Sequence, residues 1–311
     1  MSAEAILLAA VDLGSNSFRL EVARSDTAGI RPLKSVKETV RLGSGLDEQA
    51  VLDAAAMQRG WDCLSRFRAA LQDHDRLRLR AVATQTLRAA RNRDAFLARA
   101  AELLGHPVAV IDGREEARLV YRGVTQLLPP SDERRLVVDI GGGSTELILG
   151  RGATIAYMAS FPVGSVSWSL RHFPAGDFSL GAFQQAEAAA RSALASALRH
   201  CSSANWDIAY GSAGTAGALV GVLQAAGHAA DVIEADSLDW LREQLLHARH
   251  ASRLLMPGLQ EQHRAVIGGG ISVMRAVLGL LQIRRLQIAQ GGLCLGVLAE
   301  LREQLAPPTA R

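Results

Sequence analysis

The sequence predicts an α/β protein built from two similar domains, and three features of the chain indicate this fold class. An apolar strand that ends in Asp and enters a Gly/Ser turn occurs twice, from Val11 to Ser17 and from Val138 to Ser144. Segments typical of strands alternate with segments of helical periodicity. Pro129-Pro130 interrupts a helical segment near the middle of the chain. We therefore expect each domain to offer one glycine turn to a shared active-site cleft.

The first half of the chain predicts one such domain. Its apolar beginning, through Val11 and Asp12, reads as a strand, and a hairpin returns from Ser17. The expected elements after this hairpin are a strand at 30–42, a helix at 47–71, a strand at 77–83, a helix at 93–104, a strand at 107–111 and a helix from 112 to about 128.

The second half repeats this plan. Strands are expected within 136–159, helices within 165–200, a strand at 208–210 that opens into a helix, helices at 239–250 and 268–281, and a strand at 285–289. The predicted domains are residues 1–128 and 129–293, and a C-terminal helix at about 294–311 is expected to pack back on the first domain.

Composition and charge are those of an ordinary globular protein. Hydrophobic residues make up 49% and charged residues 21%, and the net charge of +3 gives no reason to expect a nucleic-acid partner. Lys34 and Lys37 are the only lysines among 34 basic residues. Genomic base composition explains this bias simply. The alternative explanation is that some arginines bind phosphates through two parallel N–H bonds. Three scattered cysteines favour a cytoplasmic location, and no apolar stretch is long enough to cross a membrane.

The two glycine turns are the strongest candidates for a binding site. Turns of small residues bring backbone N–H groups close to phosphate oxygens, and the neighbouring Asp residues suit a hard metal ion. The first turn contains Gly14, Ser15, Asn16 and Ser17 after Asp12, and the second contains Gly141, Gly142, Gly143, Ser144 and Thr145 after Asp139. The alternative is that both are ordinary hairpin turns.

Three further segments carry candidate chemistry. Gly211, Ser212, Gly214 and Thr215 join a strand to a helix N-terminus, which can bind phosphate or be only a tight junction. Glu115 and Glu116 begin a helix, where a carboxylate either caps the helix or accepts a proton from water. Arg88 is expected at the end of a strand, after small polar residues, and either binds a terminal phosphate or forms a surface salt bridge.

Together, the segments Val11–Ser17, Thr84–Arg88, Gly113–Arg118, Asp139–Glu146 and Gly211–Thr215 resemble the Ppx/GppA family, in order and spacing, from about residue 9 to about residue 300. This family comprises exopolyphosphatases and guanosine pentaphosphate phosphatases. The resemblance implies two actin-like, ribonuclease-H-like domains of the ASKHA type. The chain is similar to the short two-domain members.

The resemblance also implies roles for single residues. The family's catalytic Glu falls on Glu116 and its phosphate-orienting Arg on Arg88, while its metal-associated acids fall on Asp139 and Glu146, with Asp12 as a third metal candidate. Mg²⁺ is the implied cofactor, and Mn²⁺ is the alternative ion. One departure is the segment Gly291–Gly296, where the family often has an arginine and an acidic or serine residue.

We expect a phosphoric anhydride hydrolase that removes the terminal phosphate of inorganic polyphosphate by in-line attack of water. Guanosine pentaphosphate (pppGpp) is the alternative substrate, which would connect the enzyme to the stringent response. A rival of another class is an actin-like ATP-binding scaffold protein. No membrane partner is expected, and a homodimer is left open.

Overall fold

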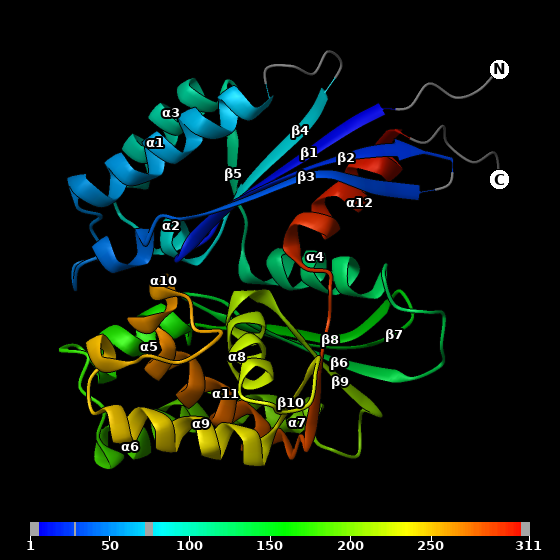
Figure 1. Cartoon of the computed structure of the whole chain (residues 1–311). Coiled ribbons are helices and arrows are strands. Elements are labelled where there is room, and N and C mark those ends of the chain that lie inside the picture. The colour runs from blue at the N-terminus through cyan, green and yellow to red at the C-terminus, as the bar shows by residue number, and fades with distance from the viewer. Residues whose placement is uncertain (1–5, 28, 72–76, 306–311) are drawn as a thin grey trace. The chain divides into compact units, whose positions relative to one another are not determined.

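A computed structural model describes residues 6–27, 29–71 and 77–305 (Figure 1). It divides into two compact units, and each has its own sheet. Unit 1 comprises residues 1–126 and 291–311, and unit 2 comprises residues 127–290. These bounds differ from the expected ones at 128 and 293. Gly291 belongs to unit 1 because it packs against Gly123, where the Cβ of any larger residue would overlap the backbone.

Unit 1 is a five-stranded mixed sheet between two layers of helices. The strands are β1 (Ile6–Leu13), β2 (Ser17–Asp26), β3 (Gly29–Thr39), β4 (Leu77–Ala83) and β5 (Val108–Val110), in the order β3-β2-β1-β4-β5. The first three are antiparallel neighbours, whereas β4 and β5 run parallel to β1. This order and direction are those of a ribonuclease-H-like sheet, so the predicted fold class is confirmed for this unit.

The helices of unit 1 cover opposite faces of its sheet. Helices α1 (Ala54–Leu71) and α3 (Arg93–Leu104) pack on one face around Phe18, Phe67 and Phe96. On the other face, Leu119 of α4 (Gly113–Thr125) and Val297 of α12 (Leu293–Leu305) join the apolar cluster on β1. The five-residue helix α2 (Gln85–Ala89) follows β4, and the 3-10 turn η1 (Leu42–Gly45) follows β3.

Helices α4 and α12 touch backbone to backbone. A Cβ on Gly296 would overlap the carbonyl of Leu119, and a Cβ on Gly123 would overlap the carbonyl of Gly292. Figure 1 shows α12, in red, against α4. The C-terminal helix therefore completes the layer that carries α4, and the part expected at 306–311 lies outside the described residues.

Unit 2 repeats the plan of unit 1 with one added strand. Its sheet has the order β10-β11-β9-β6-β7-β8. The strands are β6 (Arg134–Ile140), β7 (Thr145–Arg151), β8 (Thr154–Phe161), β9 (Ile208–Ser212), β10 (Val232–Glu234) and β11 (Arg285–Ile288). β6, β7 and β8 are antiparallel neighbours, β9 and β11 lie parallel to β6, and β10 is an antiparallel edge strand that the sequence analysis missed.

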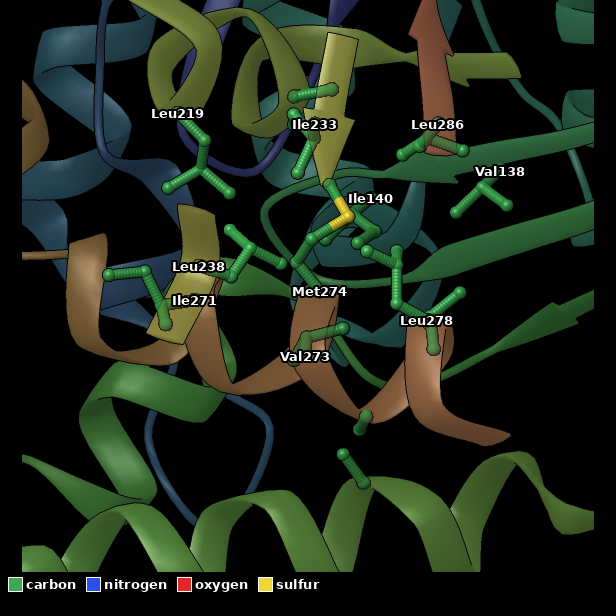
Figure 2. Packing of buried hydrophobic residues seen from close by; sticks show 14 of the residues in the cluster. Val138, Ile140, Leu219, Ile233, Leu238, Ile271, Val273, Met274, Leu278 and Leu286 are labelled. Carbon is green, nitrogen blue, oxygen red and sulfur yellow. The ribbon is translucent and has the colours of Figure 1, made fainter. Parts of the chain in front are cut away.

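The helices of unit 2 bury one large apolar core. They are α5 (Ser165–His172), α6 (Leu180–Leu194), α7 (Leu198–Cys201), α8 (Ala213–Ala225), α9 (Ala235–Ala248), α10 (Glu261–Arg264) and α11 (Ile267–Leu281), with 3-10 turns η2 (Ala195–Ala197) and η3 (Ala251–Arg253). Met274 of α11 lies among Ile140, Ile233 and Leu238, as Figure 2 shows. Gly268–Gly270 serve this packing, since a Cβ on Gly269 would meet Ser169. No helix in the described ranges combines the length and apolarity of a membrane span.

The helix expected at 239–250 lies at Ala235–Ala248, and two further sequence expectations were wrong in detail. The helix expected from Asp47 begins only at Ala54, because the Asp47 carboxylate accepts the Val51 N–H in a turn and the Asp53 carboxylate caps the helix by accepting the Ala56 N–H. Arg88 was expected at the end of a strand and instead lies on α2. Its guanidinium therefore projects from a helical turn.

Candidate functional site

The glycine turn of unit 1 joins β1 to β2 and is held in place from several sides. A Cβ on Gly14 would lie 2.9 Å from the Ser17 carbonyl oxygen, so only glycine fits without a shift. The Asn16 carbonyl accepts bonds from two backbone N–H groups at 2.8 and 3.0 Å, and the Ser15 carbonyl accepts one from Gly43 at 2.8 Å. The turn is thus fixed before any ligand binds.

Side chains of this turn offer hydrogen-bonding atoms that no described residue uses. Asn16 Oδ1 and Ser17 Oγ are buried, and neither has a hydrogen-bond partner among residues 6–27, 29–71 and 77–305. Thr86 Oγ1 of α2 donates to Ser15 Oγ at 2.7 Å. Because Ser15 accepts this bond, its own hydroxyl hydrogen can point to a ligand.

Glu116 lies in the first turn of α4, in a helix start that fixes its direction. Asp112 caps the helix by accepting a bond from the Glu115 N–H at 2.8 Å, and Glu116 N–H donates to the Asp112 carbonyl at 3.0 Å. The Glu116 residue is only 8% exposed. A carboxylate this buried requires a partner.

That partner is Arg88, although 28 residues separate the two in sequence. Arg88 Nη1 donates to Glu116 Oε2 at 3.0 Å and to the Ile111 carbonyl at 2.8 Å, and Nη2 donates to Gln85 Oε1 at 2.6 Å. A guanidinium has five N–H donors. Described residues engage three of them, which leaves two for a phosphoryl group. Arg88 can therefore hold Glu116 and bind phosphate together.

The neighbouring Glu115 has different surroundings. Arg118 donates to its two carboxylate oxygens at 2.8 Å each, and Arg80 donates at 3.2 Å. Both arginines also pair with Glu300 of α12. Hydrogen bonds from Arg118 are the main cause that holds the pKa of Glu115 below its ordinary value. Glu115 thus belongs to an ion-pair network that joins β4, α4 and α12.

The turn of unit 2 joins β6 to β7 and is braced by α5. Gly141 N–H donates to the Ser144 carbonyl at 2.9 Å, while Ser165 and Val166 N–H groups donate to the Gly141 and Gly142 carbonyls. The Thr145 hydroxyl donates to the Val163 carbonyl at 2.5 Å, so it supports the turn.

The two acids of unit 2 lie side by side. Asp139 and Glu146 are opposite each other in the β6–β7 register, so their Cβ atoms are about 5 Å apart on one face of the sheet. These two residues belong to a row across the sheet, in which Ser160 of β8 lies opposite Glu146 and Ser212 of β9 lies beside Asp139. Asp139 is 7% and Glu146 1% exposed, and Ser160 Oγ donates to Glu146 Oε1 at 2.6 Å.

The corresponding pair of residues in unit 1 is an acid and a base, whereas unit 2 has two acids. Asp12 lies opposite Arg19 of β2, where unit 2 has Glu146 opposite Asp139. Burial alone would lower the pKa of Arg19, yet Cys294, Glu21 and Asp12 nearby raise it overall. The role of Asp12 as a metal ligand stays a prediction, and its neighbour there is a cation.

The third candidate segment joins β9 to α8. Ser212 ends the strand and Ala213 has a φ of 66°, a left-handed conformation that costs a non-glycine residue free energy. Gly214 and Thr215 follow in the first helical turn. Strain of this kind is common at functional sites. The phosphate role of this segment stays a prediction.

Sequence reasoning assigned no role to Gln85, Thr86 or Ser160. Thr86 and Gln85 stand within the Thr84–Arg88 segment, so a signal for them was present. Ser160 could be found only from the register of β8 against β7. Residues 6–27, 29–71 and 77–305 contain no cluster of three or more His, Cys, Asp or Glu side chains that could hold a metal ion.

Comparison with known proteins identifies the family. Residues 21–305 match the model of the Ppx/GppA phosphatase family. The chain is 40% identical over 299 residues to the guanosine-5′-triphosphate,3′-diphosphate pyrophosphatase of Vibrio vulnificus (strain YJ016), covering 96% of this chain and 60% of that one. It thus spans about 60% of the length of the curated relatives it matches.

Solved structures show the same fold over nearly the whole chain. An exopolyphosphatase-like protein has a TM-score of 0.88 at 25% identity, covering 98% of this chain and 100% of that one. An exopolyphosphatase from Cytophaga hutchinsonii ATCC 33406 has a TM-score of 0.86 at 25% identity, covering 96% and 99%. Like the motifs quoted above and the two ribonuclease-H-like sheets, these matches lead to one conclusion: the chain belongs to the Ppx/GppA phosphatase family.

Proposed function

We propose that this protein hydrolyses the terminal phosphoanhydride bond of a linear phosphate chain. The observation that carries the proposal is the buried Glu116 held by Arg88 at 3.0 Å, in a unit that also contains the Gly14–Ser17 turn. Family membership supports it. A carboxylate fixed by a guanidinium can accept a proton from water, while the guanidinium's remaining donors bind the phosphoryl oxygens.

In this proposal the residues of unit 1 have distinct tasks. Glu116 takes the proton of the attacking water through the oxygen that Arg88 does not hold. Arg88 keeps that carboxylate in place and stabilises charge on the transferring phosphoryl group. Asn16 Oδ1 and Ser17 Oγ belong to the turn that binds the phosphate, with Ser17 and the amide of Asn16 as donors.

Unit 2 supplies the candidate metal ligands. Asp139 and Glu146 are two buried carboxylates in one row, and Mg²⁺ commonly uses one or two carboxylates together with phosphate oxygens and water. The residues therefore fit Mg²⁺, and Mn²⁺ has the same ligand preference. When bound, such an ion neutralises charge on the phosphates. Ser160 keeps the Glu146 carboxylate oriented.

Two substrates are in question. Inorganic polyphosphate is the main candidate, and the structural relatives named exopolyphosphatases support it. The second candidate is pppGpp, which the 40% identity to guanosine-5′-triphosphate,3′-diphosphate pyrophosphatases favours. Cys63, Cys201 and Cys294 are buried free thiols, as a cytoplasmic enzyme would have, and the cytoplasmic location remains part of the proposal.

Phosphate release tests the proposal. Purified protein with Mg²⁺ is incubated in parallel with medium-chain polyphosphate, pppGpp and ATP, and released phosphate is measured over time. We expect turnover of polyphosphate or pppGpp that exceeds turnover of ATP and disappears with EDTA. Tight ATP binding without release from the other two would favour the scaffold protein instead.

A further inference from the structure

Gln85 lies on α2 and contacts Arg88 in the next turn of that helix. Gln85 Oε1 accepts a bond from Arg88 Nη2 at 2.6 Å. Since arginine only donates, the carboxamide atom that faces it must be the oxygen. The orientation of the Gln85 side chain is therefore fixed by chemistry.

This bond limits how the guanidinium can rotate. Glu116 and the Ile111 carbonyl both accept from Nη1, so they hold one corner of the group. Gln85 holds a second corner through Nη2. Bonds at two corners restrict the orientation of a rigid guanidinium more than bonds at one corner do. Without Gln85, only the Nη1 bonds would hold the guanidinium, and the nitrogen that meets Glu116 would be less restricted.

We propose that Gln85 is a positioning residue, which acts through Arg88 to hold both the Glu116 carboxylate and the phosphate-binding donors of Arg88. The inference rests on the proposed function only for its catalytic consequence. Gln85 is half-buried and the apolar core of unit 1 does not include it, so we expect its replacement to leave the fold intact.

The kinetic test compares replacements that separate the acceptor from the size of the side chain. Gln85→Leu and Gln85→Ala remove the acceptor, and we expect kcat to fall about 10- to 100-fold with KM changed less than about threefold, because misplaced groups chiefly affect the transition state. Gln85→Glu keeps an acceptor, so kcat should stay within about threefold while the added charge raises KM. The control is Gln58→Leu, an exposed glutamine on α1 that bonds Asp62.

A spectroscopic test needs no substrate. Arginine side-chain ¹⁵N spectra of the whole protein at low temperature resolve Nη groups whose rotation is hindered, and Arg88→Lys identifies the signals of Arg88. These signals should broaden or merge in Gln85→Leu and persist in Gln85→Glu and Gln58→Leu.

The possible outcomes distinguish a failure of this inference from a failure of the proposed function. Unchanged Arg88 signals in Gln85→Leu would overturn it, and so would a kcat equal to that of the wild type in a folded Gln85→Leu protein. If the wild type releases phosphate from neither polyphosphate nor pppGpp, the proposed function fails, and the spectra still decide whether Gln85 positions Arg88.

Discussion

Glu115 and Glu116 are adjacent in one helical turn, and the same chemical change at each should have opposite consequences. Glu→Gln preserves size and removes the charge. Glu116 pairs with Arg88 beside the turn of unit 1, whereas Glu115 pairs with Arg118 and Arg80 in a network that reaches α12. One replacement should therefore affect activity and the other stability.

For Glu116→Gln we expect kcat to fall by about 10²–10⁴, which is the contribution of a general base. At 1.36 kcal/mol per tenfold change, this is about 2.7–5.4 kcal/mol of transition-state free energy. The amide oxygen can still accept the bond from Arg88, at about half the strength of a charged one. The free energy of unfolding should therefore fall by only about 1 kcal/mol.

For Glu115→Gln we expect the larger effect on stability and the smaller effect on activity. The amide keeps only one acceptor oxygen, so at least one of the three bonds from two arginines, at 2.8, 2.8 and 3.2 Å, is lost and the others become weaker; the Glu115 side chain is 29% exposed. Discounted for this exposure, the loss of unfolding free energy should be about 1–2 kcal/mol. The kcat value should stay within about threefold of wild type.

The assay is phosphate release at saturating substrate and Mg²⁺, run beside thermal unfolding of both variants. A kcat above one tenth of wild type in Glu116→Gln would refute its role as the base. Equal loss of kcat in both variants, with both folded, would show that charge in this helical turn matters and that Glu116 has no special role.

Four further predictions concern other parts of the molecule. Asp139→Asn should raise the Mg²⁺ concentration for half-maximal activity about 10-fold or more, and an unchanged Mg²⁺ titration would remove Asp139 from the metal site. Arg88→Lys should lose most of kcat/KM, because an ammonium cannot reproduce the planar fork; a variant as active as wild type would make Arg88 a structural partner only. The pKa of Glu115 is held low by Arg118, so its stabilisation is present above the ordinary carboxyl pKa of about 4.3 and is lost as pH falls through the lower folded value. The stability difference between wild type and Glu115→Gln, measured by urea unfolding, should thus be full at pH 6 and shrink below about pH 4, and a difference constant with pH would count against it. Gly296→Ala should cost about 1–3 kcal/mol by urea unfolding, because its Cβ would force α12 away from α4; wild-type stability would show that these helices separate easily.

The fold was largely predictable because its signals are local. The strand at 77–83 and the helix at 93–104 have the predicted bounds, since their apolar periodicity agrees with their tertiary environment. The late start of α1 was not predictable from periodicity, because a turn bond to the Asp47 carboxylate competes with a helix and Asp53 caps the helix where it begins. β10 has only three residues, too few for a pattern.

The candidate site was predictable as a set of residues and not as a set of contacts. Motif spacing indicated Glu116 and Arg88 separately, whereas their pairing depends on how α2 and α4 pack. The contact of Ser160 with Glu146 depends on a strand register that includes an irregularity between Leu149 and Gly150. Such long-range geometry leaves no periodic trace in one sequence.

The return of α12 to unit 1 fixes an order of events during synthesis. Unit 2 is continuous in sequence, so its residues have all left the ribosome before α12 does. The β1 face that Val297 and Leu298 cover, together with the α4 backbone against which Gly296 packs, stays open until α12 has been synthesised. The nascent N-terminal half therefore carries an uncovered apolar surface while unit 2 is being synthesised.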